Sequence, residues 1–180
     1  HEQGLVVYRQ AVPVPAALDS AAETTQTRPF FAPLDINIAT REDLQGLPFV
    51  GRAGQLLDKM IAAIDLRRDE VYICNVLKCR PPENRTPVPE EVEQCRPYLE
   101  QQIALVRPAL ICALGLSAVQ ALLETKSSMA SMRGKTFAWK GIPLIPTYHP
   151  AALLRNPARK REAWTDMQRV RDTLKALAGV

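Results

Sequence analysis

The sequence predicts an α/β domain of three layers, in which helices cover both faces of a central, mostly parallel sheet. Strand-like and helix-like segments alternate from residue 34 to the end of the chain. The strand-like segments are continuously apolar, which is typical of strands that are buried on both faces by helices. The chain has 180 residues, enough for one such domain with a core of its own.

Each element is predicted by its own pattern of residues. Apolar residues at helical spacing from Leu56 to Ile64 predict a helix, and Pro89 followed by acidic residues predicts the start of another. Short apolar runs that end at a turn residue predict strands. In chain order we expect a strand at 34–38, a helix at 51–66, a strand at 70–77, a helix at 88–106, a strand at 109–115, a helix at 116–124, a hairpin at 135–150 and a terminal helix at 156–177.

Residues 1–33 differ from the rest of the chain. They are rich in Pro, Ala and Thr and show little periodicity, so we interpret them as an arm or linker ahead of a domain at 34–180. The short apolar stretch "GLVVYRQ" at 4–10 leaves three alternatives open. It is a peptide that docks a protein partner, an added edge strand, or a disordered segment.

Composition limits the function classes. The net charge of +4 and the pI of about 9.0 permit a polyanionic partner without requiring one. No apolar run approaches the ~18 residues that a membrane span needs, so we expect no membrane partner. The four cysteines, in a chain with no evident export signal, predict reduced thiols or metal ligands and a cytoplasmic location.

Three loops that follow predicted strands carry candidate functional residues. "GLPFVGRAG" holds Phe49 between glycines, where the ring either stacks on a flat ligand or packs in the core. Asn75 directly follows the apolar run "VYIC", and its amide either reads the edge of a nucleobase or caps a turn. His149 ends "PLIPTY" and either donates to a developing negative charge or is structural.

Two further features lie in the same loops. Cys79 and Cys95 are sixteen positions apart, and together they would supply half of the ligands of a four-thiolate metal site. Leu153 and Leu154 precede Arg155, so two apolar side chains stand next to a cation. Such a pair suits a wedge that enters a base stack, and the same stretch equally suits the start of a helix.

Taken together, "GLPFVGRAGQLLDKM", "YICNVLKCRPPENRTPVPEEVEQCRPYLEQQIALVRP" and "IPTYHPAALLRNPARKREAWTDM" resemble the family 4 uracil-DNA glycosylases, the iron–sulfur type. The resemblance covers about residues 42–175 and implies the uracil-DNA glycosylase fold and excision of uracil from single- or double-stranded DNA in base-excision repair. It implies that Phe49 stacks on the flipped uracil, that Asn75 reads its edge and that His149 stabilises the negative charge on the leaving base. It assigns the DNA contacts to four residues, namely Gly51, Arg52, Leu154 and Arg155.

The chain departs from that family in two places. Where the family has a "GEAPG"-like segment with the acidic residue for the attacking water, this chain reads "INIATREDLQG", and 37–40 contain neither carboxylate nor glycine. The family's upstream Cys-x-x-Cys, which with the equivalents of Cys79 and Cys95 holds a [4Fe–4S] cluster, is also missing. Cys74 and Cys112 lie in apolar runs typical of core positions, so we expect no intact cluster.

These losses predict that glycosylase activity is weak or lost, and they leave two alternatives. One is a non-catalytic adaptor, similar to the psi subunit of the bacterial clamp loader, that docks a partner through its first residues. The other is a DNA-binding protein that senses damage without cleavage. Its phosphate contacts would come from basic residues near the C-terminus, namely Arg155, Arg159, Lys160, Arg161, Arg169 and Arg171.

Overall fold

A computed structural model describes residues 4–9, 51–78, 85 and 87–179 of the chain, which fall in one compact unit. The elements in chain order are β1 (Gly4–Arg9), α2 (Arg52–Ala62), η1 (Arg68–Glu70), β2 (Val71–Asn75), α3 (Pro89–Val106), β3 (Pro108–Leu114), α4 (Leu116–Leu123), α5 (Met129–Met132), β4 (Phe137–Trp139), β5 (Ile142–Thr147), α6 (Pro150–Arg155), η3 (Pro157–Arg159) and α7 (Lys160–Ala178). Helices and strands therefore alternate as the sequence predicts.

The described sheet has five strands in the order β2-β1-β3-β5-β4. Strands β3 and β5 pair in parallel, whereas the β2–β1, β1–β3 and β5–β4 pairs are antiparallel. Because β2 and β3 both run against β1, the strands β2, β3 and β5 share one direction. The predicted α/β class is confirmed, and the described sheet is mixed rather than mostly parallel because β1 and β4 run opposite to the other three strands.

Strand β1 occupies an interior position. Its backbone pairs with β2 on one side, from Gly4 opposite Asn75, and with β3 on the other, from Gly4 opposite Leu114. Residues 4–9 therefore form an interior strand and not an edge strand. The proposed boundary at residue 33, the expected strand at 34–38 and Phe49 all lie outside the described residues.

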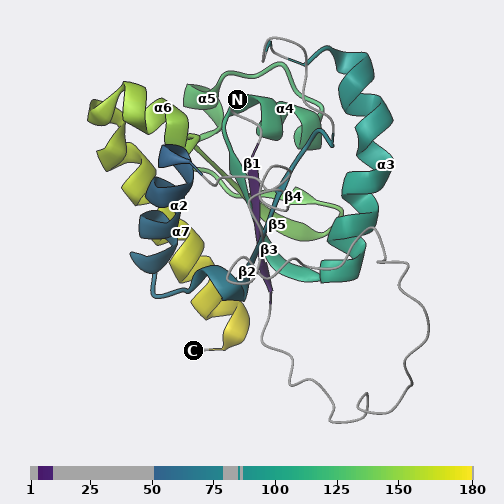
Figure 1. Cartoon of the computed structure of the whole chain (residues 1–180). Helices are drawn as coiled ribbons and strands as arrows, with labels where there is room; N and C mark the ends of the chain where they lie inside the picture. Colours follow the sequence, from purple (N-terminus) through teal and green to yellow (C-terminus); the bar gives the residue numbers. More distant parts are fainter. Residues whose placement is uncertain (1–3, 10–50, 79–84, 86, 180) are drawn as a thin grey trace, which may run out of the picture. The chain divides into compact units, whose positions relative to one another are not determined.

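Helices cover both faces of the sheet, as the three-layer prediction requires (Figure 1). Alternate residues of β3 point to the two sides, so Ile111 and Ala113 enter one core while Leu110 and Leu114 enter the other. Helices α3, α4 and α5 close the first core. Helices α2 and α7 close the second core, with Leu57 as one of its buried residues.

Local sequence explains how several elements begin and turn. Pro89 stands at the first helical position of α3, and the Glu91 carboxylate accepts a hydrogen bond of 3.1 Å from the Val88 N–H. Lys140 and Gly141 both have positive φ, which gives the two-residue turn that suits the predicted β4–β5 hairpin. In the part of the chain that the structure describes, no helix is both long and apolar enough to cross a bilayer.

The pairing register brings the ends of the three co-directional strands to one edge of the sheet. Asn75 of β2 lies opposite Gly4, Gly4 lies opposite Leu114 of β3, and Leu114 lies opposite Thr147 of β5. The loops that leave this edge are the ones in which open α/β sheets bind ligands. Asn75 and the segment after Thr147 are therefore on the same side of the molecule, as the sequence predicts.

Candidate active site

A pocket of about 390 Å³ opens at this edge, beside the end of β5. Its wall is apolar at Leu116, Met129 and Ala152, and it carries polar groups at His149 and Asn156. The remaining lining residues are Gly115, Tyr148, Arg155 and Arg159. A mostly apolar cavity with a few polar groups and cations at its wall suits a flat polar ring attached to an anionic backbone.

His149 is the buried polar group of this pocket. Its side chain is only 4% exposed, and it caps α6 by accepting a hydrogen bond of 3.1 Å at Nδ1 from the Ala151 N–H. Burial, supported by the nearby positive charge of Arg155, lowers the pKa of His149 to about 3. The imidazole is therefore neutral at pH 7, and because Nδ1 accepts a hydrogen bond, the ring proton is on Nε2.

Gly115 also lines the pocket. It ends β3 and precedes α4 with a φ of +89°, a backbone conformation that residues with a Cβ rarely adopt. Its N–H donates to the Thr147 carbonyl at 2.8 Å. This bond joins the end of β3 to the end of β5 next to the pocket lining.

Tyr148 is the single residue between the end of β5 and His149. The guanidinium carbon of Arg133 lies 4.7 Å from the centre of its ring, and that of Arg159 lies 4.9 Å from it. Burial and the Glu162 carboxylate raise the pKa of the Tyr148 phenol above its usual value. The residue before the histidine is thus held by two arginines and faces the same pocket.

The candidate DNA-contacting residues lie on two helices that pack together, α2 and α6. Gly51 and Arg52 are exposed at the start of α2. Leu154 is 39% exposed near the end of α6, and Arg155, which follows it, is exposed and lines the pocket. Leu153, by contrast, is buried in the core, so of the two leucines Leu154 alone points outward as a wedge would.

Asn75 is the last residue of β2 and is exposed at the same edge, although it does not line the pocket around His149. The Lys78 ammonium donates to the Asn75 carbonyl oxygen at 2.7 Å and also bonds to the Gln102 side chain. Three strand spacings separate Asn75 from Thr147, a distance of about 14 Å. Phe49 lies outside the described residues.

Comparison with known proteins matches residues 36–168 to the uracil DNA glycosylase superfamily. The type-4 uracil-DNA glycosylase of Archaeoglobus fulgidus is 45% identical over 137 residues, which cover 72% of this chain and 69% of that protein. The type-4 enzyme of Pyrobaculum aerophilum is 48% identical, covering 70% of this chain and 68% of that protein. The Thermotoga maritima enzyme is 44% identical, with coverage of 74% and 72%.

The chain belongs to the uracil DNA glycosylase superfamily. The identity to type-4 enzymes over most of the chain confirms the resemblance that the three sequence motifs indicated. The pocket beside His149 therefore lies inside the segment that the superfamily shares, and so do Asn75, Leu154 and Arg155.

The cysteines of this glycosylase superfamily member divide into two groups. Cys74 and Cys112 are buried in the two cores, on opposite faces of the sheet. Burial raises the pKa of both thiols, that of Cys74 to about 11, so both keep their protons. Cys95 lies on α3 with its Sγ 3.4 Å from the Lys78 N–H, and Cys79 is outside the described residues.

No group of three or more potential metal ligands is found among the residues that the structure describes. A [4Fe–4S] cluster requires four thiolate ligands, and two protonated thiols in separate cores cannot join Cys79 and Cys95. The described residues therefore do not fit the cluster of the type-4 group.

Sequence reasoning missed the side chains that support His149. Tyr148, Arg133 and Asp166 were not singled out, because an aromatic, an arginine and an aspartate in separate elements show no common spacing. The "TYHP" stretch held one available signal, an aromatic residue directly before the histidine. The basic residues of the terminal region are exposed except Arg171, which is partly buried beside Asp172.

Proposed function

We propose that this chain excises uracil from DNA by hydrolysing the N-glycosidic bond, as a member of the base-excision repair pathway. Support comes from its superfamily, from its identity to enzymes named type-4 uracil-DNA glycosylases and from the pocket at the carboxyl edge of the sheet. The observation that carries the proposal is His149, a neutral imidazole buried in the wall of that pocket.

The role of His149 follows from its protonation state. As the glycosidic bond breaks, its electron pair moves onto the uracil ring and negative charge develops on the base oxygens. A neutral imidazole with its proton on Nε2 can donate a hydrogen bond to such an oxygen without first losing a proton. Because burial disfavours the imidazolium, the group keeps this form throughout the neutral pH range.

The pocket dimensions and lining suit one extruded base. A volume of about 390 Å³ accommodates a single nucleobase with part of its sugar. A base must leave the duplex before its glycosidic bond can be reached, and stacking and edge contacts then hold it. We assign the stacking to Phe49 and the edge contact to Asn75, on the family resemblance and on the position of Asn75 at the same sheet edge. Because Asn75 lies outside the pocket lining, this assignment requires the bound base to extend from the pocket toward the end of β2.

The DNA itself would be held by the exposed residues around the pocket mouth. We assign to the exposed Leu154 the entry into the space that the base leaves, and to Arg155, Arg52 and the Gly51 backbone the contacts to the flanking phosphates. Uracil-containing DNA, single- or double-stranded, is accordingly the proposed partner.

Hydrolysis also requires a water molecule that is oriented and deprotonated. Because residues 37–40 lack the carboxylate of the family's loop, we expect slow turnover in which charge stabilisation by His149 supplies much of the remaining acceleration. No reaction step is assigned to a cluster. A freshly purified sample should show no iron–sulfur absorption, and a stoichiometric cluster would reveal ligands that this assignment lacks.

The test is single-turnover release of uracil with enzyme in excess over a single-stranded uracil oligonucleotide, with a thymine oligonucleotide as the substrate control. His149→Ser retains a side chain that can cap α6 but removes the imidazole donor. The expected loss in rate is about 100- to 1000-fold, the usual effect of removing one donor to an oxyanion. The proposal fails if the unaltered chain releases no uracil, or if His149→Ser releases it at the unaltered rate.

The adaptor alternative predicts binding without release, through the first residues of the chain. Residues 4–9 pair with neighbours on both sides, so their backbone groups are already used within the sheet. This observation does not favour a docking peptide, and we retain the adaptor only as the outcome in which a folded chain shows no glycosylase activity.

A further inference from the structure

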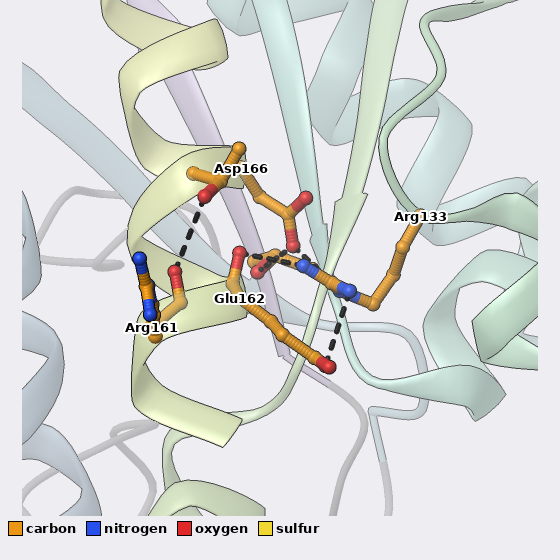
Figure 2. A network of polar contacts seen from close by, with 6 residues as sticks. Arg133, Arg161, Glu162 and Asp166 are labelled. Carbon is orange, nitrogen blue, oxygen red and sulfur yellow. Dashed lines mark hydrogen bonds and ion pairs between the residues drawn. The ribbon is translucent and has the colours of Figure 1, made fainter. Parts of the chain in front are cut away.

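Arg133 is a mostly buried arginine that lies outside the pocket and contacts one of its walls. It follows α5, and its side chain is 14% exposed. Its Nε donates to Asp166 Oδ2 at 2.8 Å, its Nη1 donates to Glu162 Oε2 at 3.1 Å, and its Nη2 donates to the Glu162 main-chain oxygen. Figure 2 shows the side chain reaching across to Glu162 and Asp166 of α7. All three guanidinium nitrogens thus donate hydrogen bonds to residues of one helix, α7.

Asp166 anchors this arrangement from the core. It is 1% exposed, and its Oδ2 also accepts a hydrogen bond of 2.9 Å from Thr147 Oγ1. The other oxygen, Oδ1, has no partner within hydrogen-bonding distance among the described residues. Burial raises the pKa of Asp166, whereas the contacts from Thr147, Arg133 and the Gly134 backbone oppose that shift. A buried carboxylate of this kind depends on its cation, so the pair is fixed in place.

Three consecutive residues at the end of β5 are held by this arrangement. Thr147 bonds to Asp166, Tyr148 lies under the Arg133 guanidinium at 4.7 Å, and His149 follows immediately in the pocket wall. The chain therefore cannot shift at His149 without disturbing either the cation–π contact or the buried ion pair.

We propose that Arg133 is a positioning residue for the uracil pocket: anchored by Asp166, its guanidinium holds the Tyr148 ring and thereby fixes the strand end that carries His149. The inference rests on the proposed function, because it assigns a purpose to the position of His149. Arg133 is a positioning residue rather than a catalytic one, since it reaches the pocket only through Tyr148.

The chemistry requires an arginine. A guanidinium is planar, so it can use its edge for three hydrogen bonds and its face for an aromatic ring at the same time. A lysine at 133 would keep a positive charge near Asp166 but would lose the planar face and the forked contacts to Glu162. Arg133→Lys therefore separates neutralisation of the buried carboxylate from orientation of Tyr148.

The experiment compares Arg133→Lys, Tyr148→Leu and the double variant in the single-turnover uracil assay, with oligonucleotide affinity measured separately. Each single variant is expected to slow release about 10- to 100-fold, the usual effect of a small misplacement of a reacting group, while affinity changes less than about threefold. The double variant should be little slower than either single one, because both changes remove the same contact. Tyr148→Phe, which keeps the ring, should restore most of the rate.

Arg96→Lys is the matched control. Arg96 is also partly buried and paired with a glutamate, Glu124 at 2.7 Å, but it lies on α3, away from β5. The Arg96→Lys variant should release uracil at the rate of the unaltered chain and bind the oligonucleotide with the same affinity. Additive losses in the double variant, or a normal rate in Arg133→Lys, would overturn the positioning role. If Arg133→Lys shows no cooperative thermal transition, Tyr148→Leu and Tyr148→Phe decide the question alone.

A second readout does not require activity. The ring resonances of His149 in a nuclear magnetic resonance spectrum should shift and broaden in Arg133→Lys and Tyr148→Leu, and remain unchanged in Arg96→Lys. If the unaltered chain releases no uracil, the proposed function fails while these spectra still test the positioning of His149. Unchanged spectra in all variants would refute the inference even in an active protein.

Discussion

Two strand ends at the same edge of the sheet are supported in opposite ways. At the end of β5, Thr147, Tyr148 and His149 are each held by side-chain contacts, and both Thr147 and His149 are buried. At the end of β2, Asn75 is exposed, and its main-chain oxygen accepts a hydrogen bond from the side chain of Lys78. The register places the two ends in one row across the sheet.

The difference matches the two chemical tasks that we propose for these strand ends. A donor that stabilises developing charge is effective when it is fixed in a site that excludes water, so that no reorganisation is needed during the reaction. An amide that reads the edge of a base can stay accessible until that base arrives. The side chains at the β5 end are therefore fixed in the core, whereas Asn75 at the β2 end stays accessible on the surface.

The largest expected effect comes from removing the cation at the β5 end. Arg133→Met leaves the Asp166 carboxylate buried without its partner, which should lower the free energy of unfolding by about 3 to 5 kcal/mol. Urea denaturation followed by circular dichroism measures the change. The matched variant Arg96→Met breaks a more exposed pair with Glu124 and should cost no more than about 1 kcal/mol. If the two variants lose equal free energy of unfolding, the buried ion pair at the β5 end contributes no more than an exposed one.

The second effect is a pH dependence of stability that originates at His149. The unfolded histidine titrates near its ordinary pKa of 6.5, whereas the folded one titrates at about 3. Between these values the unfolded state binds a proton that the folded state does not, so stability is fully present above pH 6.5 and falls as the pH falls. The slope reaches at most about 1.4 kcal/mol per pH unit.

Denaturation of the unaltered chain and of His149→Ser at several pH values between 5 and 7 isolates this contribution, because few carboxylates titrate there. The variant should lack the slope. The rate of uracil release should likewise show no step near pH 6.5 from this residue. A step at that pH that disappears in His149→Ser would mean that the folded imidazole has its ordinary pKa.

A smaller effect is expected at the β2 end. Lys78→Met removes the ammonium that bonds to the Asn75 carbonyl and to Gln102, and should lower stability by about 1 kcal/mol. If Asn75 reads the base, affinity for uracil DNA should fall a few-fold while single-turnover release at saturation stays near normal. Lys175→Met, an exposed lysine in the last turn of α7, is the control. A loss of rate without loss of affinity would assign Lys78 to the chemical step.

Much of the fold could be predicted from the sequence, because each element carries a local signal. The apolar spacing of α2, the Pro89 start of α3 and the continuous apolar run of β3 depend only on neighbouring residues. The direction and place of β1 could not be predicted in this way. An apolar hexapeptide fits many sheet positions, and its partners β2 and β3 are distant in sequence.

The candidate site was predicted in the same uneven manner. His149 and Asn75 stand at strand ends, where the residue type and the preceding apolar run point to an edge of the sheet. Arg133 and Asp166 meet only in the folded chain, 33 positions apart, and no periodicity links them. A buried aspartate in an amphipathic helix could have raised suspicion, since Asp166 falls on the face that carries Met167 and Val170.

The smallest expected effect concerns Arg159, which contacts the same ring as Arg133 but is exposed at the pocket mouth. If it binds a DNA phosphate, Arg159→Gln should weaken binding a few-fold to uracil and thymine oligonucleotides alike, and reduce the slope of log affinity against log salt by about 1. Arg133→Lys should leave that slope unchanged, because its side chain is mostly buried. If Arg159→Gln instead keeps the normal salt slope of affinity but slows uracil release, Arg159 positions Tyr148 as Arg133 does. The distinction between a buried positioning arginine and an exposed DNA-binding arginine would then be wrong.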